Sequence, residues 1–195
     1  MVINLKQVKM KQNYFLIAVF AILMISCKSK IDNETYSEFQ KKGNETATLA
    51  QSVLLANVGQ AIQKGGAEYA VEFCNLKASA IVDSLNHANN CLISRVSAKN
   101  RNPGNNLNTE TDKILWAIFE SGTLNDTVIH ESKTLIYYKT IKTSLPACLK
   151  CHGFPGSDID STTTVKLKTL YPDDLATGYK LNDFRGLWKI EFKVD

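Results

Sequence analysis

Methionine is nearly absent from this sequence, and its three copies, Met1, Met10 and Met24, all lie within the first 24 residues. If the N-terminal segment is removed, the remaining chain has no thioether sulfur with which to bind a metal. An apolar run that could span a membrane is also lacking, because the run from Tyr14 to Ile25 is shorter than the required length of about 20 residues. No internal repeat or low-complexity segment is present, and charges of both signs alternate along the chain.

The N-terminal segment is typical of an export signal. Lys6, Lys9 and Lys11 form a basic region that precedes the apolar run, and the run ends at Ser26-Cys27. This ending resembles a bacterial lipobox, which predicts cleavage before Cys27 and attachment of lipid to it. The alternative is an uncleaved signal anchor, which needs no cysteine at this position. We therefore expect a signal peptide over residues 1–26, a tether and helix start over 27–45, and one domain over 46–195, lipid-anchored on the periplasmic side of the cell envelope.

The mature chain is close to neutral, because the leader takes three lysines and no acidic residue with it. Twenty basic residues then face nineteen acidic ones, a net charge of +1. A nucleic-acid-binding domain would need a basic patch or stripe, and none is evident. The length of the mature chain suits one globular domain.

The most specific pattern is Cys148-Leu149-Lys150-Cys151-His152. Two thiols three positions apart can each add to one vinyl group of haem, and the following imidazole can bind the iron. Random placement of the chain's five cysteines and three histidines would give such a pentapeptide with a probability of about 0.002. The motif predicts one covalently bound haem c. Export supports this prediction, because c-type haem is attached outside the bacterial cytoplasm.

A zinc site is the alternative interpretation of the same cluster. Zinc would need a fourth ligand and usually a second pair of cysteines at similar spacing, and no second pair exists. The remaining cysteines, Cys74 and Cys91, could form a disulfide in an oxidising compartment.

The second axial ligand of the iron has several candidates: Cys74, Cys91, His87, His130, a lysine or an open position. Cys74 is favoured because it lies on the apolar stripe of a predicted helix, where a haem face could pack, and because ferric iron ionises a bound thiol. His87 falls at the polar end of the same helix, and His130 at the end of a predicted strand.

The pattern of apolar residues predicts helices first and a sheet afterwards, which indicates an α+β fold. A helix over 36–63, with Leu49, Val53, Leu54 and Ala56 on its apolar side, ends at Gly65-Gly66, and a second helix covers 67–86. Thr109 and Asp112 can cap a third helix. Strands are expected over 91–97, 127–130 and 135–142, and a last strand, 188–194, is expected to bury one face and expose Lys189, Glu191 and Lys193. One of Tyr137 and Tyr138 is expected to face inward. A short polar segment follows the haem motif.

Several segments together resemble the single-haem c-type cytochromes with a PAS-like fold, long catalogued as a domain of unknown function. They are Glu72-Phe73-Cys74, residues 95–105 including Arg-Asn-Pro, Cys148–Gly153, Tyr171-Pro172-Asp173-Asp174 through Tyr179, and Asp183-Phe184-Arg185-Gly186. The resemblance covers residues from about 46 to the C-terminus. One departure is Asp112-Lys113 in the third helix, where the family has a Trp-Glu pair.

The resemblance implies a PAS-like antiparallel sheet with long N-terminal helices, and His and Cys as axial ligands, which places Cys74 opposite His152. Arg101 and Arg95 are candidate partners of the haem propionates, because guanidinium groups pair well with carboxylates. The family's implied role is redox or gas sensing, with output through a signalling or redox partner protein, or electron transfer. An enzyme is not expected, since no acid-base pair is evident beside the iron.

Overall fold

The structure, a computed structural model, describes residues 31–194 of the chain. The predicted signal peptide and Cys27 lie outside the described residues. Among the residues that the structure describes, no helix combines the length and the apolar character that a membrane span requires.

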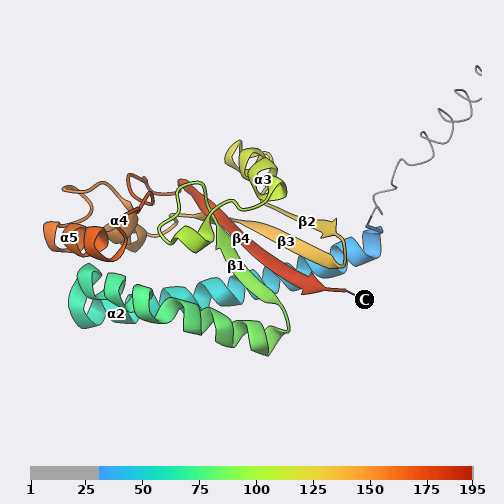
Figure 1. Cartoon of the computed structure of the whole chain (residues 1–195), viewed down its shortest axis with the longest axis horizontal. Helices are drawn as coiled ribbons and strands as arrows, with labels where there is room; N and C mark the ends of the chain where they lie inside the picture. Colours follow the sequence, from blue (N-terminus) through green and yellow to red (C-terminus); the bar gives the residue numbers. More distant parts are fainter. Residues whose placement is uncertain (1–30, 195) are drawn as a thin grey trace, which may run out of the picture. The chain divides into compact units, whose positions relative to one another are not determined.

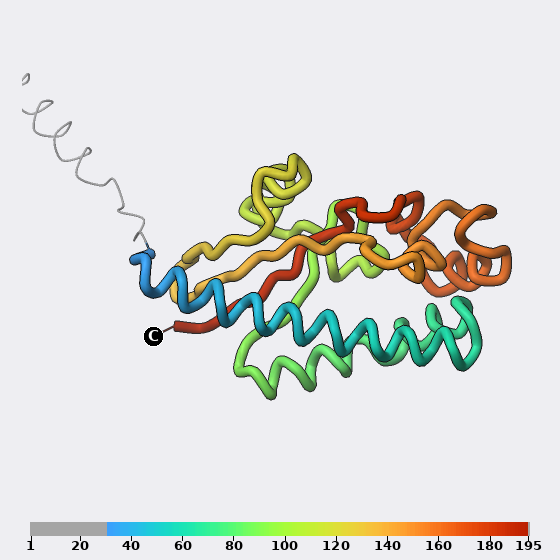
Figure 2. Tube along the Cα trace, turned by 180° about the vertical axis from the view of Figure 1, so that it is seen from behind, coloured from blue at the N-terminus to red at the C-terminus, as the bar shows by residue number. Residues whose placement is uncertain are grey.

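The N-terminal part is a hairpin of two long helices that share the label α2 (Asn33–Asn89). Gly65 and Gly66 interrupt it with non-helical backbone, and Gly66 has a φ of +72°, a left-handed value that glycine adopts without strain. The two halves run antiparallel, side by side (Figures 1 and 2). Asp32 caps the start of α2 by accepting a hydrogen bond from the amide of Thr35 at 2.8 Å. The predicted helices and the glycine break between them are confirmed.

A four-stranded antiparallel sheet follows, built from β1 (Leu92–Val96), β2 (Asp126–Glu131), β3 (Thr134–Lys142) and β4 (Phe184–Lys193). The strand order is β1-β4-β3-β2, so the last strand lies in the middle of the sheet. Residues that precede the haem motif and residues near the C-terminus are thus adjacent in space. The α+β prediction, with long N-terminal helices and an antiparallel sheet, is confirmed.

Both faces of the sheet are covered. Helix α2 packs on one face, and α3 (Glu110–Glu120) packs on the other (Figure 1). Tyr137 belongs to the hydrophobic cluster on the α2 side and Tyr138 to the cluster on the α3 side. Both side chains are fully buried. The expectation that one of the two tyrosines faces inward is confirmed, and the second is buried as well, because this strand has no solvent-exposed face at these positions.

The same double coverage corrects the prediction for the last strand. Trp188, Ile190 and Phe192 are buried as expected, but Lys189 on the opposite face is also buried. Its ammonium group lies 3.1 Å from Oδ1 of Asp112 on α3, and the same carboxylate oxygen accepts a hydrogen bond from Tyr138 at 2.8 Å. The predicted exposed face is therefore wrong at Lys189, which forms a buried ion pair, whereas Glu191 is half-buried and Lys193 is exposed as expected. The family departure at Asp112 has a structural role, since this residue joins α3 to the sheet.

The buried side of the first helix also differs from the prediction. Leu49 and Ala56 are exposed, Val53 and Leu54 are half-buried, and the buried residues of this stretch are Gly43, Thr46, Ala47 and Ala50. Small side chains allow the helix backbone to approach the sheet closely. The predicted apolar side is therefore wrong for Leu49 and Ala56, whereas Leu54 packs against the cluster between α2 and the sheet.

Replacing Gly43 by alanine is expected to destabilise the protein by about 1–3 kcal/mol. An added Cβ would overlap the ring of Tyr137, which is fixed in the core. Gly59, in the same helix, offers a matched control, because a Cβ at that position meets no neighbouring atom within 4 Å. Gly59→Ala should raise stability by up to about 1 kcal/mol through helix propensity. Urea unfolding of both variants checks the prediction, and equal effects of the two substitutions would contradict it.

Three shorter helices complete the domain: η1 (Pro103–Asn105), α4 (Pro146–His152) and α5 (Ser161–Leu170). The predicted short polar segment after the haem motif is wrong over α5. Its sequence has little apolar periodicity, but Asp160 caps its start and Leu167 packs in a small cluster with Val71 of α2. Lys166 forms ion pairs with Glu68 and Glu72 of α2. Tertiary contacts with α2 therefore stabilise this helix.

Candidate functional site

The three residues of the attachment motif lie on α4, which follows β3 after a short connection and begins with Pro146. Proline suits this first helical position, because its missing N–H would have no partner there. Cys148, Cys151 and His152 are all half-buried. Helix α4 lies beside α5 and the tip of the α2 hairpin (Figure 1).

The ring of His152 is held by the backbone of the 171–179 loop. Its Nδ1 lies 2.7 Å from the carbonyl oxygen of Ala176. A carbonyl can only accept, so Nδ1 carries the proton and Nε2 keeps its lone pair. The amides of Gly178 and Tyr179 donate to the carbonyls of Gly153 and His152, at 2.8 and 3.0 Å. The loop and α4 are thus joined on both sides of the histidine.

The electrostatic surroundings keep this imidazole neutral. Burial lowers the pKa of His152 well below its usual value, and the positive charges of Arg101, Arg185 and Arg95 lower the pKa further. The hydrogen bond to Ala176 opposes this effect without reversing it. A neutral imidazole with a protonated Nδ1 and a free Nε2 is the form that binds a metal ion.

Arg101 forms several hydrogen bonds within the protein, in addition to its predicted role as a propionate partner. Its Nε donates to Oδ2 of Asp174 at 3.0 Å, and its Nη2 donates to the carbonyl oxygen of Cys151 at 2.6 Å. A longer contact, of 3.4 Å, joins Nη2 to the carbonyl of Ala176. The guanidinium also lies 5.8 Å from the ring centre of Tyr171. Arg101 therefore connects α4 to the 171–179 loop.

Cys74 comes to the same place from the second half of α2. Burial raises the pKa of the Cys74 thiol, and the charges of Arg95 and Arg101 lower it in part. Burial likewise raises the pKa of Cys151 to about 11, and Cys74 is near enough to contribute. Val71, one helical turn before Cys74, packs in a hydrophobic cluster with Cys151, so this part of α2 lies beside the attachment motif.

Cys91 lies away from this group, in contact with the hydrophobic cluster between α2 and the sheet. The helix that separates it from Cys74 continues for 15 residues beyond Cys74, or about 22 Å. Cys74 and Cys91 are both free thiols, so the alternative of a disulfide between them is wrong. In the described part of the chain, no cluster of three or more His, Cys, Asp or Glu residues is arranged to hold a metal ion.

The two other histidines do not reach the site. His87 is exposed and lies 13 residues along α2 from Cys74, about 20 Å at a rise of about 1.5 Å per residue. His130 is exposed and pairs with Leu135 at the start of β3, whereas α4 follows the end of β3. The seven-residue step from Leu135 to Lys142 spans about 23 Å. The strand and helix geometry separates both histidines from His152.

Three arginines surround the site. Arg95 comes from β1, Arg101 from the loop before η1 and Arg185 from β4. Among residues 31–194, the ion pair between Arg101 and Asp174 is the only one that any of the three arginines forms. Arg185 donates through Nη1 to Ser97 and to the carbonyl of Lys99, but its buried Nε has no partner. In the part of the chain that the structure describes, the guanidinium groups of Arg95 and Arg185 therefore have no acidic side chain paired with them.

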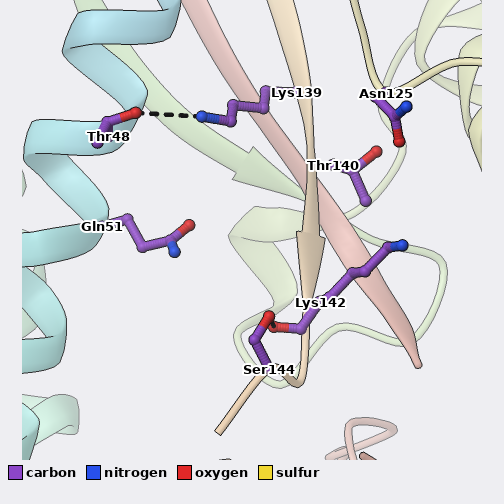
Figure 3. Close-up of a pocket in the computed structure, with 7 residues that line it drawn as sticks. All are labelled: Thr48, Gln51, Asn125, Lys139, Thr140, Lys142 and Ser144. Carbon is purple, nitrogen blue, oxygen red and sulfur yellow. Dashed lines mark hydrogen bonds between the residues drawn. The ribbon is translucent and has the colours of Figure 1, made fainter. Parts of the chain in front are cut away.

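A polar pocket of about 290 Å³ lies elsewhere, between α2 and the C-terminal end of β3 (Figure 3). Its lining is Thr48, Gln51, Asn125, Lys139, Thr140, Lys142 and Ser144. Lys139 is already occupied by hydrogen bonds to Asn44 and Thr48. None of the predicted site residues lines this pocket, so it is separate from the group around His152.

Sequence reasoning did not assign a role to Asp174, Arg185 or the backbone of Ala176. All three lie in segments that carried the family resemblance, 171–179 and 183–186. Their location in these segments was the signal in the sequence that could have indicated a role at the site. Which atom each residue contributes became visible only when the loop was placed against α4.

Comparison with solved structures finds the cyanobacterial heme-protein Tll0287, with a TM-score of 0.60 and 19% sequence identity. The match covers 80% of this chain and 95% of that one. At this identity the likeness shows a shared fold. No curated protein matches the sequence. The family model named Tll0287-like matches residues 7–192, nearly the whole chain, in agreement with the resemblance that the motifs carried. This chain is therefore a member of the Tll0287-like family.

Proposed function

We propose that this chain is an exported lipoprotein that holds one haem c, bound through Cys148 and Cys151, with His152 and Cys74 as axial ligands. The observation that carries the proposal is the packing of α2 against the attachment motif on α4: Val71, three residues before Cys74, shares a hydrophobic cluster with Cys151. Membership of the Tll0287-like family and the shared fold with a heme-protein support it. Lipid on Cys27 would tether the domain to a membrane of the cell envelope.

The residues present fit haem on three observations. His152 offers Nε2 as a ligand, because Ala176 fixes the proton on Nδ1. The arginines around the site leave two positive charges without an ion pair, and haem carries two propionates. The buried Nε of Arg185 has no partner among residues 31–194. We propose that Arg95 and Arg185 bind the propionates, with Arg101 contributing its remaining donors.

The proposed role is that of a redox or gas sensor that acts through a partner protein and catalyses no reaction itself. A bound haem supplies an iron that changes oxidation state and, with a free coordination position, takes a diatomic gas. Cys74 belongs to a helix that packs against the sheet. Loss of its bond to the iron would therefore change the position of this helix relative to the sheet. This connection favours sensing.

The second candidate is a single-haem electron carrier in the cell envelope, favoured by the lipid tether that the Cys27 sequence predicts. Rapid binding of carbon monoxide or nitric oxide to the reduced protein supports the sensor. Fast reversible electron exchange with a cytochrome, without a change of ligand, supports the carrier. Both measurements use the intact haem-loaded protein.

Replacing Cys74 by alanine tests the axial ligand. We expect the low-spin thiolate signal of the ferric protein in electron paramagnetic resonance to disappear completely in Cys74→Ala, while covalent haem remains. Cys91→Ala is the matched control, since Cys91 is another half-buried free thiol that lies outside the site. It should leave the spectrum unchanged. The same thiolate signal in Cys74→Ala and in the wild type would refute the ligand assignment.

A further inference from the structure

The side chain of Asp174 joins two groups that flank the imidazole of His152. Its Oδ2 accepts a hydrogen bond from Nε of Arg101 at 3.0 Å, and its Oδ1 accepts one from the amide of Ala176 at 2.8 Å. The side chain is 9% exposed, so water competes little with either bond. Both oxygens of one buried carboxylate are therefore engaged.

These two bonds fix two backbone segments that contact His152: the residue before it in the chain and Ala176. The amide held by Asp174 belongs to Ala176, whose own carbonyl oxygen accepts the hydrogen bond from Nδ1 of His152 at 2.7 Å. The guanidinium held by Asp174 donates to the carbonyl of Cys151, the residue before His152. One carboxylate thus positions both the backbone that carries the ring and the acceptor that orients it.

We propose that Asp174 is a positioning residue that sets the tautomer and the direction of His152. It holds the Ala176 carbonyl at hydrogen-bond distance from Nδ1, which leaves Nε2 as the atom that would bind iron. Outer-sphere partners of this kind fix the ring and raise the basicity of a metal-binding histidine. The tautomer is a property of the protein itself, whereas the consequence for the iron rests on the proposed haem function.

Replacing Asp174 by asparagine removes the charge that holds Arg101 and places an amide group beside its N–H donors. We expect the Nδ1 proton of His152, observed by nitrogen-edited NMR in the reduced protein, to exchange with solvent at least about tenfold faster than in the wild type, the factor for a loss of about 1.4 kcal/mol. The reduction potential of the haem should become more positive, because a less basic imidazole stabilises ferric iron less.

Asp173→Asn is the matched control, because this neighbouring carboxylate is exposed and the substitution changes the net charge by the same amount. It should leave the Nδ1 exchange rate and the potential unchanged. If Asp174→Asn fails to fold, Asp174→Glu keeps the charge but shifts the carboxylate by one methylene, and an exchange rate above the wild-type value is expected.

Wild-type exchange in either folded Asp174 variant would overturn the proposal, as would equal effects of the Asp173 and Asp174 substitutions. Failure of the haem function is seen separately, as free thiols at Cys148 and Cys151 in the mass spectrum of the wild type. The Nδ1 exchange of His152 can be measured in that case too, so the two failures are distinguishable.

Discussion

Simultaneous replacement of Cys148 and Cys151 by serine is expected to abolish covalent haem attachment completely. In the proposed haem c each thiol would form one thioether bond to a vinyl group, and a serine hydroxyl is too weak a nucleophile to replace it. Thioether bonds survive denaturation, whereas the bonds to axial ligands do not. Haem staining of the wild type on a denaturing gel should therefore be positive, and that of the double variant should be negative.

Single variants make this prediction sharper. Cys148→Ser and Cys151→Ser each keep one thioether, so a haem with one unmodified vinyl group should remain, visible as a red-shifted band in its pyridine haemochrome spectrum. Cys91→Ser removes a thiol outside the site and should retain both bonds. Haem that stays bound to the double variant after denaturation would rule out attachment through α4.

The second large effect is expected at the buried ion pair between α3 and the sheet. Replacing Asp112 by asparagine leaves the ammonium of Lys189 buried without its closest counter-ion. It also weakens the capping box, in which the Asp112 carboxylate accepts from the amide of Thr109. Breaking a buried pair from one side costs about 3–5 kcal/mol, and Glu191, 3.9 Å from Lys189, should keep the loss near 3 kcal/mol.

The stabilisation by Asp112 should depend on pH in a defined direction. Burial by itself would raise the pKa of Asp112, but hydrogen bonds from Tyr138, Thr109 and Lys189, and the charge of Lys189, bring it below its usual value. A carboxyl whose pKa is lower in the folded state stabilises the fold above its unfolded pKa of about 3.9. The difference in unfolding free energy between wild type and Asp112→Asn should therefore be full at pH 7 and shrink as the pH falls below about 4.

Urea unfolding at several pH values measures this difference. Glu110→Gln is the matched control, because Glu110 is an acidic residue in the same helical turn whose exposed side chain pairs with Lys113. An exposed pair of this kind contributes less than about 1 kcal/mol. A loss in Asp112→Asn no larger than in Glu110→Gln would contradict the role of Asp112, and so would a difference that does not change with pH.

The local sequence was sufficient to predict features that depend only on residues close together in the chain. Gly65-Gly66 ends a helix because glycine adopts backbone angles that other residues avoid, and the structure places the break there. Thr109 and Asp112 cap α3 through side chains that reach neighbouring amides, which needs no distant partner. The spacing of Cys148, Cys151 and His152 also uses local information only, since these residues are neighbours on one turn of α4, and haem attachment through them stays a prediction.

Other features depend on the tertiary structure, namely where a second side of an element is also buried and which distant residues come into contact. The alternation in β4 predicted that Lys189 is exposed to solvent, but α3 covers that face of the sheet, and Asp112 forms an ion pair with the lysine. Helix α5 lacks an apolar pattern and is held by α2. The role of Asp174 is of the same kind, because it depends on bonds to Arg101, 73 residues away, and to a backbone amide. Short-range patterns encode backbone angles and local capping, whereas burial and long-range hydrogen bonds are set by how the helices and the sheet pack.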